Sequence, residues 1–399
     1  MAHHTCDFLI IGNSAAGVTA AEFLSVAAPG KSIIMISHEP YHCYGRPLIS
    51  YLLEGKTDRE HLDYKPADFY EKRGIETLFG AEFEAVALDA SAHEVTLAGG
   101  EEISYGKCLL ATGSVPFVPP IAGMEGHTNV HTFITLDDAL AAWDDVREAT
   151  SRAHAEGRES RVVVIGGGLI GMKAAEALSH HADRIDVFDR SPRILPAVLD
   201  ADGAAVVERL VEPYGIYCHR GMSVDEMLGE GERVTHVRLT DGTDEACDMV
   251  IVAVGVRPAS KLAVEAGAEQ GRGLVCGPDL QTSLADVYAA GDVTQVTDTL
   301  DGSERPLALW PNAVRQGRIA AMHMAGVPGA LPDEGSFAVN AVDFFDVTLL
   351  TSGIINPPAD GDFDVRVEVE GDEYVKFVMR DGKLVGYVLL NRPDNAGMY

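Results

Sequence analysis

Residues 8–17 read Phe8-Leu9-Ile10-Ile11-Gly12-Asn13-Ser14-Ala15-Ala16-Gly17, and a stretch of the same kind returns at residues 162–171 as Val162-Val163-Val164-Ile165-Gly166-Gly167-Gly168-Leu169-Ile170-Gly171. Each stretch leads from a short apolar strand, through a glycine turn, into a helix rich in alanine and leucine. In this context, backbone N–H groups and the start of a helix can hold a pyrophosphate. One such match is weak evidence, but two in one chain predict a protein that binds two dinucleotides at once.

An acidic residue follows each glycine turn. Glu39 lies just past the expected strand 32–37, and Asp189 follows the expected strand 184–188, 23 residues after Gly166. A carboxylate at this place can accept hydrogen bonds from the hydroxyls of an adenosine ribose. Both acidic residues are therefore candidate nucleotide-binding residues.

Asp189 also bears on which nicotinamide coenzyme the chain uses. Its carboxylate would repel the 2′-phosphate of NADPH and so favours NADH. Arg190 and Arg193 follow it, however, and an arginine could accommodate that phosphate. We expect NADH, with NADPH as the alternative.

Composition limits the partners of the chain. A formal net charge of −30 over 399 residues opposes binding to nucleic acid or to an anionic membrane. No apolar run approaches the ~20 residues that span a bilayer, and the N-terminus lacks the basic start and apolar segment of a signal peptide. The six cysteines form no CxxC pair, so we expect no metal site and no dithiol redox pair. We expect a cytoplasmic protein.

Further landmarks follow the two glycine turns. The expected strand over residues 108–114 ends in small residues that include Ala111, Thr112 and Gly113, and the expected strand over residues 249–255 ends at Gly255. The stretch Tyr288-Ala289-Ala290-Gly291-Asp292 precedes an expected helix over residues 311–324. Small residues at such places let the backbone pass close to a cofactor.

The last part of the chain differs in character. From about Leu331, runs of apolar residues separated by turn dipeptides predict strands and not helices. The expected strands cover residues 338–350, 363–370, 374–380 and 384–390. A further helix is expected earlier in the chain, over residues 139–155, which are rich in Ala, Asp and Glu.

Together, these landmarks resemble the FAD-dependent pyridine nucleotide-disulfide oxidoreductases with the glutathione-reductase-like fold, over essentially the whole chain. The resemblance implies an α/β fold with two Rossmann-like dinucleotide-binding domains, the NAD domain being inserted in the FAD domain, and a small, mainly β C-terminal α+β domain. The implied boundaries are 1–125 and 275–330 for the FAD-binding domain, 126–274 for the NAD(P)H-binding domain and 331–399 for the C-terminal domain.

The resemblance also implies that the cofactors are FAD and NADH, and which residues hold them. Asp292 would contact the ribityl chain of FAD, and Trp310 would begin a helix whose N-terminus points at the flavin. The implied FAD-binding residues are Gly12, Ser14, Ala15, Ala16, Gly17, Glu39, Arg46, Pro47, Ala111, Thr112, Gly113, Gly291, Asp292 and Trp310. The implied NADH-binding residues are Gly166, Gly168, Leu169, Ile170, Gly171, Asp189 and Gly255.

The segment Tyr41–Tyr51 should lie near the isoalloxazine ring and indicates where the electrons leave. Its pattern Tyr44-x-Arg46-Pro47-x-x-Ser50 resembles rubredoxin reductases, ferredoxin reductases of oxygenase systems and the flavin part of NADH-dependent nitrite reductases. These proteins pass electrons to a small redox protein or to an internal metal centre. Tyr51 stands where such ferredoxin reductases usually have Lys, and the chain lacks the clustered cysteines that nitrite reduction needs. The expected acceptor is therefore a small electron-carrier protein such as rubredoxin.

Two other functions stay open. Cys43 lies in the same segment, and Arg46 could stabilise its thiolate. With both as catalytic residues, the chain would be a single-cysteine NADH-dependent coenzyme A-disulfide or persulfide reductase, or an NADH oxidase or peroxidase, with a small-molecule acceptor. Against this, Cys43 lies only four residues past Glu39, where those enzymes place it about ten past. The third reading is a flavin-binding interaction module without turnover, and the sequence predicts no oligomeric state.

Overall fold

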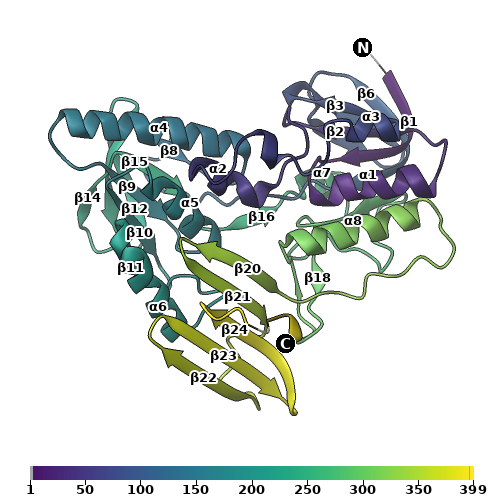
Figure 1. Cartoon of the computed structure of the whole chain (residues 1–399). Helices are drawn as coiled ribbons and strands as arrows, with labels where there is room; N and C mark the ends of the chain where they lie inside the picture. The colour runs from purple at the N-terminus through teal and green to yellow at the C-terminus, as the bar shows by residue number, and fades with distance from the viewer. Residues whose placement is uncertain (1–2, 395) are drawn as a thin grey trace. The chain divides into compact units, whose positions relative to one another are not determined.

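The computed structural model describes residues 3–394 and 396–399 (Figure 1). Its backbone separates into two compact units, each built from three stretches of chain. The first unit comprises Met1–Gly45, Glu60–Val115 and Arg257–Phe337, and the second comprises Arg46–Arg59, Pro116–Val256 and Ala338–Tyr399. The α/β fold class that the sequence predicts is confirmed, whereas the expected boundaries of three domains stay a prediction.

A mainly parallel sheet forms the centre of the first unit. Its strands are ordered β3-β2-β1-β6-β5-β4, and β17 also pairs with β6. The strands are β1 (His3–Ile11), β2 (Ile33–Ser37), β3 (Ile75–Phe79), β4 (Ala85–Asp89), β5 (Glu94–Leu97), β6 (Glu102–Leu110) and β17 (Val287–Ala289). Leu9 and Ile10 of β1 are both fully buried, but they belong to core clusters on opposite faces of the sheet. Burial on both faces explains why this strand is apolar without alternation.

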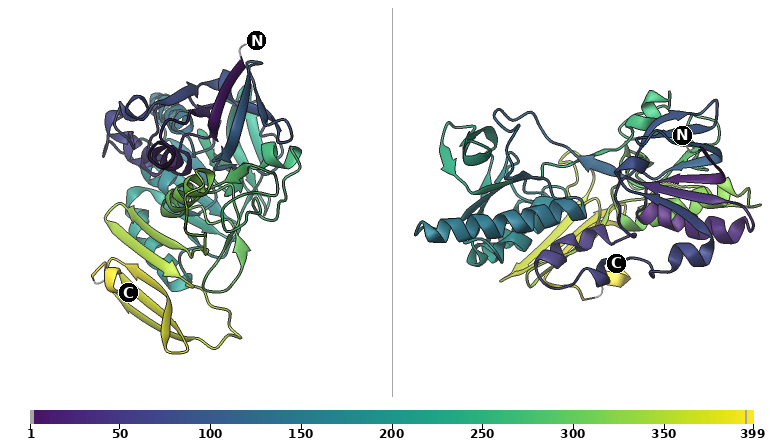
Figure 2. Two further views of the ribbon diagram at one scale, coloured as in Figure 1. Left: turned by 90° about the vertical axis from the view of Figure 1, so that its right-hand side faces the viewer. Right: turned by 90° about the horizontal axis from the view of Figure 1, so that it is seen from above.

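The helices of the first unit are α1 (Ala15–Ala27), α3 (Phe69–Arg73), α7 (Lys261–Glu265) and α8 (Trp310–Met324). Helices α1 and α8 lie side by side although almost 300 residues separate them in sequence, as both views of Figure 2 show. The helix expected over residues 311–324 is confirmed as α8. Short strands complete the unit and its borders: β7 (Ser114–Pro116), β16 (Val256–Pro258), β18 (Val296–Thr297) and β19 (Glu304–Arg305).

The second unit has a parallel sheet of its own, ordered β11-β10-β9-β15-β8. Its strands are β8 (Val130–His131), β9 (Arg161–Ile165), β10 (Arg184–Asp189), β11 (Ile216–Arg220) and β15 (Met249–Val252). A small sheet accompanies it, formed by β12 (Val224–Glu230), β13 (Arg233–Leu239) and β14 (Asp244–Ala246). The helices are α2 (Ile49–Leu53), α4 (Leu136–Ala155), α5 (Leu169–Ser179) and α6 (Ala201–Val211).

Helix α4 begins three residues before the expected start at residue 139. Thr135 caps it, because its side chain accepts the N–H of Asp138 at 3.0 Å while the Asp138 carboxylate accepts the Thr135 N–H at 3.0 Å. This reciprocal capping box satisfies two backbone donors that a helix start otherwise leaves unpaired. No helix among the described residues is long and apolar enough to cross a membrane.

The C-terminal part of the second unit is an antiparallel sheet ordered β20-β21-β24-β23-β22. Its strands are β20 (Val339–Phe344), β21 (Val347–Gly353), β22 (Asp364–Glu370), β23 (Glu373–Arg380) and β24 (Lys383–Leu390). The single strand expected over residues 338–350 is wrong, because the chain turns at Phe345-Asp346 and forms a hairpin. Phe345 has a φ of +52°, which a bulky residue rarely adopts, so the sequence carries no turn signal there.

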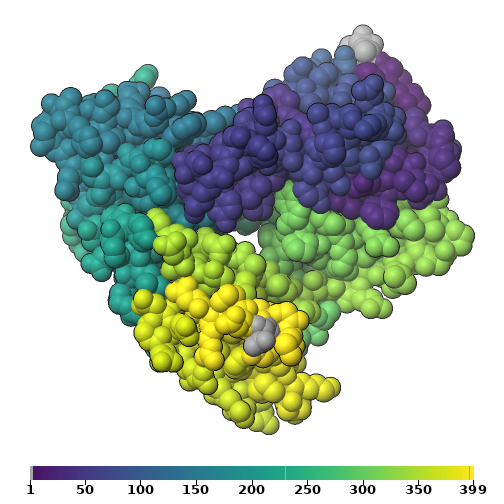
Figure 3. All heavy atoms as spheres, in the orientation of Figure 1, coloured from purple at the N-terminus to yellow at the C-terminus, as the bar shows by residue number. Residues whose placement is uncertain are grey.

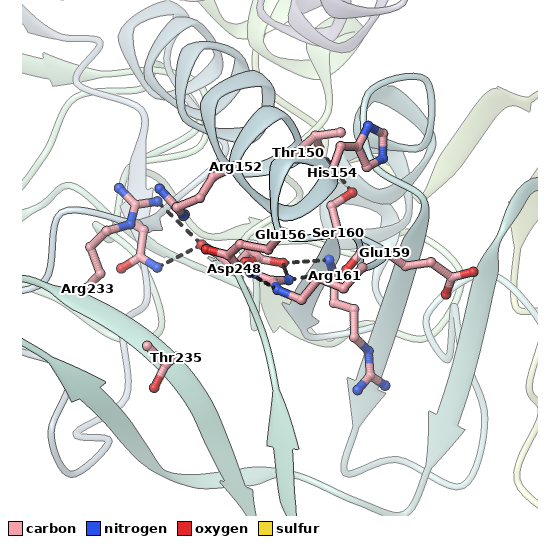
Figure 4. A network of polar contacts seen from close by, with 12 residues as sticks. Thr150, Arg152, His154, Glu156, Glu159, Ser160, Arg161, Arg233, Thr235 and Asp248 are labelled. Carbon is pink, nitrogen blue, oxygen red and sulfur yellow. Dashed lines mark hydrogen bonds and ion pairs between the residues drawn. The ribbon is translucent and has the colours of Figure 1, made fainter.

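Asp248, directly before β15, joins the starts of two interior strands of the second sheet, β15 and β9 (Figure 4). Its carboxylate accepts two hydrogen bonds from Arg158, at 2.7 and 2.8 Å, and one from the Arg161 N–H at 2.9 Å. Its backbone carbonyl accepts from the buried Asn129 side chain at 2.8 Å. Burial acts to raise the pKa of Asp248, but the hydrogen bonds from Arg158 and Arg161 outweigh it and lower that pKa below its usual value.

Replacing Asp248 by Asn should lower the free energy of unfolding by about 2 kcal/mol at pH 7, because charge-assisted hydrogen bonds are lost. A folded-state pKa below the unfolded value of about 3.9 stabilises the fold above that pH and stops doing so as the pH falls through the folded value. The difference between wild type and Asp248→Asn should therefore shrink below about pH 4. Urea unfolding at pH 7 and at pH 3.5 measures both.

The matched control is Glu156→Gln, since Glu156 also contacts Arg158, at 2.8 Å, but has a side chain that is 52% exposed. An exposed pair of this kind contributes about 1 kcal/mol at most. An equal decrease in the free energy of unfolding in both variants would contradict the role given to Asp248. A decrease in Asp248→Asn that does not depend on pH would contradict it as well.

Candidate functional site

The first glycine turn brings strand, helix and a neighbouring strand end into backbone contact. Gly12 has a φ of +117°, and a Cβ there would lie 2.1 Å from the Ala111 carbonyl oxygen. A Cβ at Gly17 would lie 2.0 Å from the carbonyl oxygen of Gly12. Neither position can hold a side chain, so both glycines are needed for the turn itself.

Helix α1 starts directly after this turn. Ser14 is its N-cap residue, and its side chain makes no capping hydrogen bond. The first turn, which includes Ala15 and Ala16, contains no acidic residue. The helix start therefore presents backbone donors and a partial positive charge with no carboxylate from its own first turn, which suits a pyrophosphate.

The end of β6 lies beside the turn. The Ala111 N–H donates to the Ile11 carbonyl at 2.8 Å, which fixes the two strand ends together. Thr112 donates its hydroxyl to the carbonyl of Ala259 at 2.8 Å, and Gly113 follows with a φ of +69°. The structure thus brings Ala111 and Gly12 together, as the sequence predicts for backbone that approaches one cofactor.

Gly291 is held by α8, and Asp292 is held by Ser114. The N–H of Gly291 donates to the Gln316 side chain at 2.8 Å, and a carboxylate oxygen of Asp292 accepts from the Ser114 hydroxyl at 3.1 Å. A Cβ at Gly317 would lie 2.2 Å from the carbonyl oxygen of Ala16. Helix α8 therefore packs backbone to backbone on the first turn of α1, which brings Asp292 to the same end of the unit as the glycine turn.

Trp310 begins α8, and its ring packs edge-on against Tyr64 with centroids 5.0 Å apart. Pro311 follows it in the first turn of the helix, where a missing N–H costs nothing. The predicted start of the helix is confirmed, and its role toward a flavin stays a prediction.

Glu39 is 7% exposed, and its carboxylate accepts a hydrogen bond from the hydroxyl of Tyr44 at 2.6 Å. This contact was not predicted from the sequence, where Tyr44 was only part of a pattern. The hydrogen bond fixes the orientation of the Glu39 carboxylate.

Asn13, inside the first glycine turn, is held by residues that sequence reasoning missed. Its side-chain oxygen accepts from the Tyr70 hydroxyl at 2.6 Å, and its amide donates to the Tyr41 carbonyl at 3.0 Å. The Tyr70 oxygen also accepts the N–H of Cys43 at 3.3 Å. Burial raises the pKa of Tyr70, so its hydroxyl stays protonated and keeps donating. No sequence signal links Asn13 to a tyrosine 57 residues away.

Cys43 is fully buried, with 0% exposure, in the core that α1 and α8 share with the sheet. Arg46, which we expected beside its thiolate, belongs to the second unit together with Pro47. There, the guanidinium of Arg46 donates to the carbonyl of Ile134 at 3.4 Å. The joint catalytic role of Cys43 and Arg46 stays a prediction.

The second glycine turn repeats the geometry of the first. Gly166 has a φ of +108°, and a Cβ there would lie 2.4 Å from the Ala253 carbonyl oxygen. A Cβ at Gly171 would lie 1.9 Å from the Gly166 carbonyl oxygen. At Gly168, the N-cap of α5, a Cβ would meet no atom within 4 Å, so this side of the turn faces open space.

The residues around this turn are placed as one cluster. Leu169 and Ile170 form the first turn of α5, and Gly255 lies exposed just beyond β15 with a φ of +129°. Asp189 lies at the end of β10, where one carboxylate oxygen accepts the Gly167 N–H at 2.6 Å and the other accepts the Ser191 N–H at 2.7 Å. Asp189 therefore holds the glycine turn in shape, and its role toward a ribose stays a prediction.

The two arginines after Asp189 differ in their surroundings. Arg190 is exposed, whereas Arg193 donates from Nε to the carbonyl of Leu199 at 3.0 Å. Arg193 is thus tied to its own loop. Arg190 is the one with the freedom to meet a coenzyme phosphate.

A buried group of charges holds α2 against α5. Lys173 forms ion pairs with Glu176 and Glu54, and Lys56 pairs with Glu54 at 2.7 Å. The side chains of Glu54 and Glu176 are 0% and 1% exposed. The Lys173 ammonium also lies 4.5 Å from the ring centroid of Tyr51. This cluster was not predicted from the sequence, and its Lys173 places a positive charge beside the ring of Tyr51.

Both glycine turns therefore fit the pyrophosphate of a dinucleotide: each is too crowded for a side chain on its inner side and ends at an open helix start. In the first unit, the predicted residues Gly12, Ala111, Gly291 and Asp292 gather around one turn. In the second, Gly166, Gly168 and Asp189 gather around the other.

Comparison with known proteins agrees with this geometry. Residues 6–317 match the family model of the pyridine nucleotide-disulphide oxidoreductases. The chain is 28% identical to nitrite reductase [NAD(P)H] of Bacillus subtilis over 96% of its own length, and spans about half (45%) of that relative. It is 27% identical to rubredoxin-NAD(+) reductase of Pseudomonas putida, with 98% of this chain and 97% of the relative covered.

Among solved structures, the ferredoxin reductase of the CYP199A2 system from Rhodopseudomonas palustris superposes with a TM-score of 0.86 at 27% identity, covering 98% of this chain and 93% of that one. The matched family segment includes both glycine turns and the Gly291-Asp292 stretch. The family match and these relatives identify the chain as an NAD(P)H-dependent oxidoreductase with FAD and NADH as its cofactors. The chain therefore belongs to the pyridine nucleotide-disulphide oxidoreductase family.

Proposed function

We propose that this chain takes electrons from NADH and passes them, by way of FAD, to a small electron-carrier protein of the rubredoxin or ferredoxin kind. The observation that carries the proposal is that the chain has two glycine turns that fit the pyrophosphate of a dinucleotide, and that Cys43 is fully buried. Two such turns suit the transfer of electrons between two bound dinucleotides. A buried thiol that packs in a core does not suit attack on a disulfide or peroxide from solvent.

FAD, when bound, supplies a ring that accepts a hydride and can release electrons singly. The turn Gly12–Gly17 and the start of α1 would bind its pyrophosphate, and Glu39 would accept from its ribose. Asp292, oriented by Ser114, would accept from its ribityl hydroxyls. Trp310 and the start of α8 would lie toward the ring, where a helix N-terminus stabilises negative charge.

The turn Gly166–Gly171 would hold NADH in the second unit. Gly168 leaves room for the pyrophosphate, and Asp189 would accept from the adenosine ribose while keeping the Gly167 N–H in place. Because a carboxylate repels a 2′-phosphate, NADH is the proposed coenzyme.

The carrier protein is proposed from the relatives and from the Tyr44-x-Arg46-Pro47 segment. The Pseudomonas putida relative is a reductase of rubredoxin, and the Rhodopseudomonas palustris structure is a reductase of ferredoxin. A nitrite reductase also matches, but this chain lacks the clustered cysteines for its metal centres. A small carrier protein is the acceptor that these two relatives favour.

The acceptor proposal predicts the stoichiometry of reduction. In an anaerobic titration of the oxidised holoprotein, about one equivalent of NADH per flavin should bleach the flavin absorbance fully, both in wild type and in Cys43→Ser. Cys276→Ser is the control for a cysteine replacement as such, because Cys276 is partly exposed and its pKa is raised to about 12 by burial.

Uptake of a second equivalent that disappears in Cys43→Ser alone would instead make Cys43 a redox centre. The function would then be reduction of a disulfide, persulfide or peroxide. Reduction of rubredoxin or ferredoxin at catalytic rates, with no turnover on coenzyme A-disulfide, is the expected companion result. Stoichiometric reduction with no catalytic turnover on any acceptor would favour the interaction module.

Coenzyme preference tests the role of Asp189. Asp189→Ser should lower kcat/KM for NADH about 10-fold or more, since a charge-assisted hydrogen bond to the ribose is lost. It should also reduce the preference for NADH over NADPH. Steady-state rates with both coenzymes measure this, and flavin content checks that the protein stays loaded.

Arg190→Gln is the second arm of this experiment, because Arg190 is exposed in the same loop. NADH kinetics should be unchanged in Arg190→Gln if Asp189 sets the preference. A wild type that prefers NADPH, and loses that preference in Arg190→Gln, would contradict the proposed coenzyme.

A further inference from the structure

Strand β22 (Asp364–Glu370) is the outer strand of the C-terminal sheet of the second unit, as Figures 1 and 2 show. All seven of its residues are exposed, and the yellow-green end of the chain lies open at the surface in Figure 3. Within the described part of the chain, no strand pairs with β22 on its outer side. The strand reads Asp-Val-Arg-Val-Glu-Val-Glu, so that valines alternate with charged residues.

The three valines share one face of the sheet. Val365, Val367 and Val369 lie opposite Val378, Lys376 and Tyr374 of β23 in the strand register. Helix α6 and its N-cap cover that face at β23, where Tyr374 and Lys376 both hydrogen-bond Asp200, at 2.5 and 2.6 Å. On β22 this cover has ended, and the valines are 41%, 43% and 55% exposed.

The backbone of β22 is also open to a further strand. Residues 371–372 form the turn to β23, so the carbonyl of Glu370 faces the N–H of Glu373 across the hairpin. Because N–H and C=O groups alternate in direction along a strand, those of the three valines point outward. Natural sheets block such edges with bulges, prolines or charged side chains, lysine above all. The charges of β22 are of both signs, so they oppose pairing in some registers and favour it in others. Strand β22 pairs with β23 without a register shift and contains neither proline nor lysine.

Charge makes this edge complementary to itself. In an antiparallel pair of two β22 strands with the two-fold axis at Val367, Val365 lies opposite Val369 of the second copy. The same register places Arg366 opposite Glu368 of the second copy, twice in the pair. Opposite charges placed directly across an antiparallel pair stabilise it, and like charges destabilise it.

The neighbouring registers are disfavoured. Moving the axis to residue 366 or 368 places Arg366 opposite Arg366, or Glu368 opposite Glu368. In the favoured register, only Asp364 and Glu370 meet as like charges, at the exposed ends of the strand where salt screens them. Within one copy, Arg366 pairs with Asp364 at 3.1 Å and Glu368 pairs with Arg392 at 3.2 Å, both at exposed positions that can rearrange.

We propose that β22 pairs with β22 of a second copy of this chain, joining two five-stranded sheets into one continuous sheet across a symmetric dimer. The inference goes beyond the proposed function and does not depend on it. A ribbon of seven residues buries less surface than a standard stable interface. The dimer is therefore weak, and its population rises with protein concentration.

Sedimentation velocity of the full-length holoprotein over a concentration series tests this, at an ionic strength that screens the net charge of −30. Wild type should shift from monomer to dimer as concentration rises. Arg366→Glu and Glu368→Arg should each weaken the dimer about 10-fold or more, because each places like charges opposite one another twice. The double variant Arg366→Glu with Glu368→Arg should restore the wild-type constant, since it rebuilds both pairs.

Val367→Lys places two ammonium groups at the axis and should also give a monomer. Val26→Lys is the matched control, because Val26 is a 76% exposed valine on α1 of the first unit, and it should leave the dimer unchanged. Circular dichroism and flavin content check that each variant folds.

Wild type that stays monomeric at every concentration overturns the proposal, as does a dimer that persists unchanged in Arg366→Glu and Val367→Lys. If the wild type is monomeric and binds the carrier protein, and Val367→Lys abolishes that binding, then the edge is a binding site for the carrier protein instead.

Discussion

The close approach of backbone to backbone at two glycine turns is the constraint on which the rest of this molecule depends. In each unit, the last glycine of the turn packs its helix onto the carbonyl of the first glycine, and the first glycine packs onto the end of a neighbouring strand. A Cβ at any of these glycines would lie only 1.9–2.4 Å from a carbonyl oxygen. This crowding leaves the helix start open at the end of the sheet. The same close packing that joins helix and sheet therefore also forms the two candidate pyrophosphate-binding sites.

Much of this could be predicted from the sequence, because glycine spacing and apolar strands are local signals. Both turns, α8 and the small β region were expected where the structure has them. The hairpin at Phe345 was missed, since no glycine or asparagine marks a turn that a phenylalanine makes with positive φ. The pairs Tyr70–Asn13 and Lys173–Glu54 were also out of reach, because each joins residues far apart in the chain.

Several predicted residues have a structural duty besides the expected functional one. Asp189 accepts two backbone N–H groups, Glu39 accepts the Tyr44 hydroxyl, and Gly291 donates to Gln316. Spacing rules identify such residues by their place relative to a ligand. They do not reveal that the carboxylate is already oriented by the protein, which lowers the cost of ordering it when a dinucleotide binds.

The division of each unit into three stretches of chain has a consequence for synthesis. Strand β17, near residue 288, is needed to complete the edge of β6, and Gly317 is needed to cover the first turn of α1. Both leave the ribosome long after β1, β6 and α1 have emerged. Until then, the sheet and helix around the first glycine turn form an incomplete domain with an uncovered apolar face. This domain gains its native partners only after the strands and helices around the second glycine turn have been made.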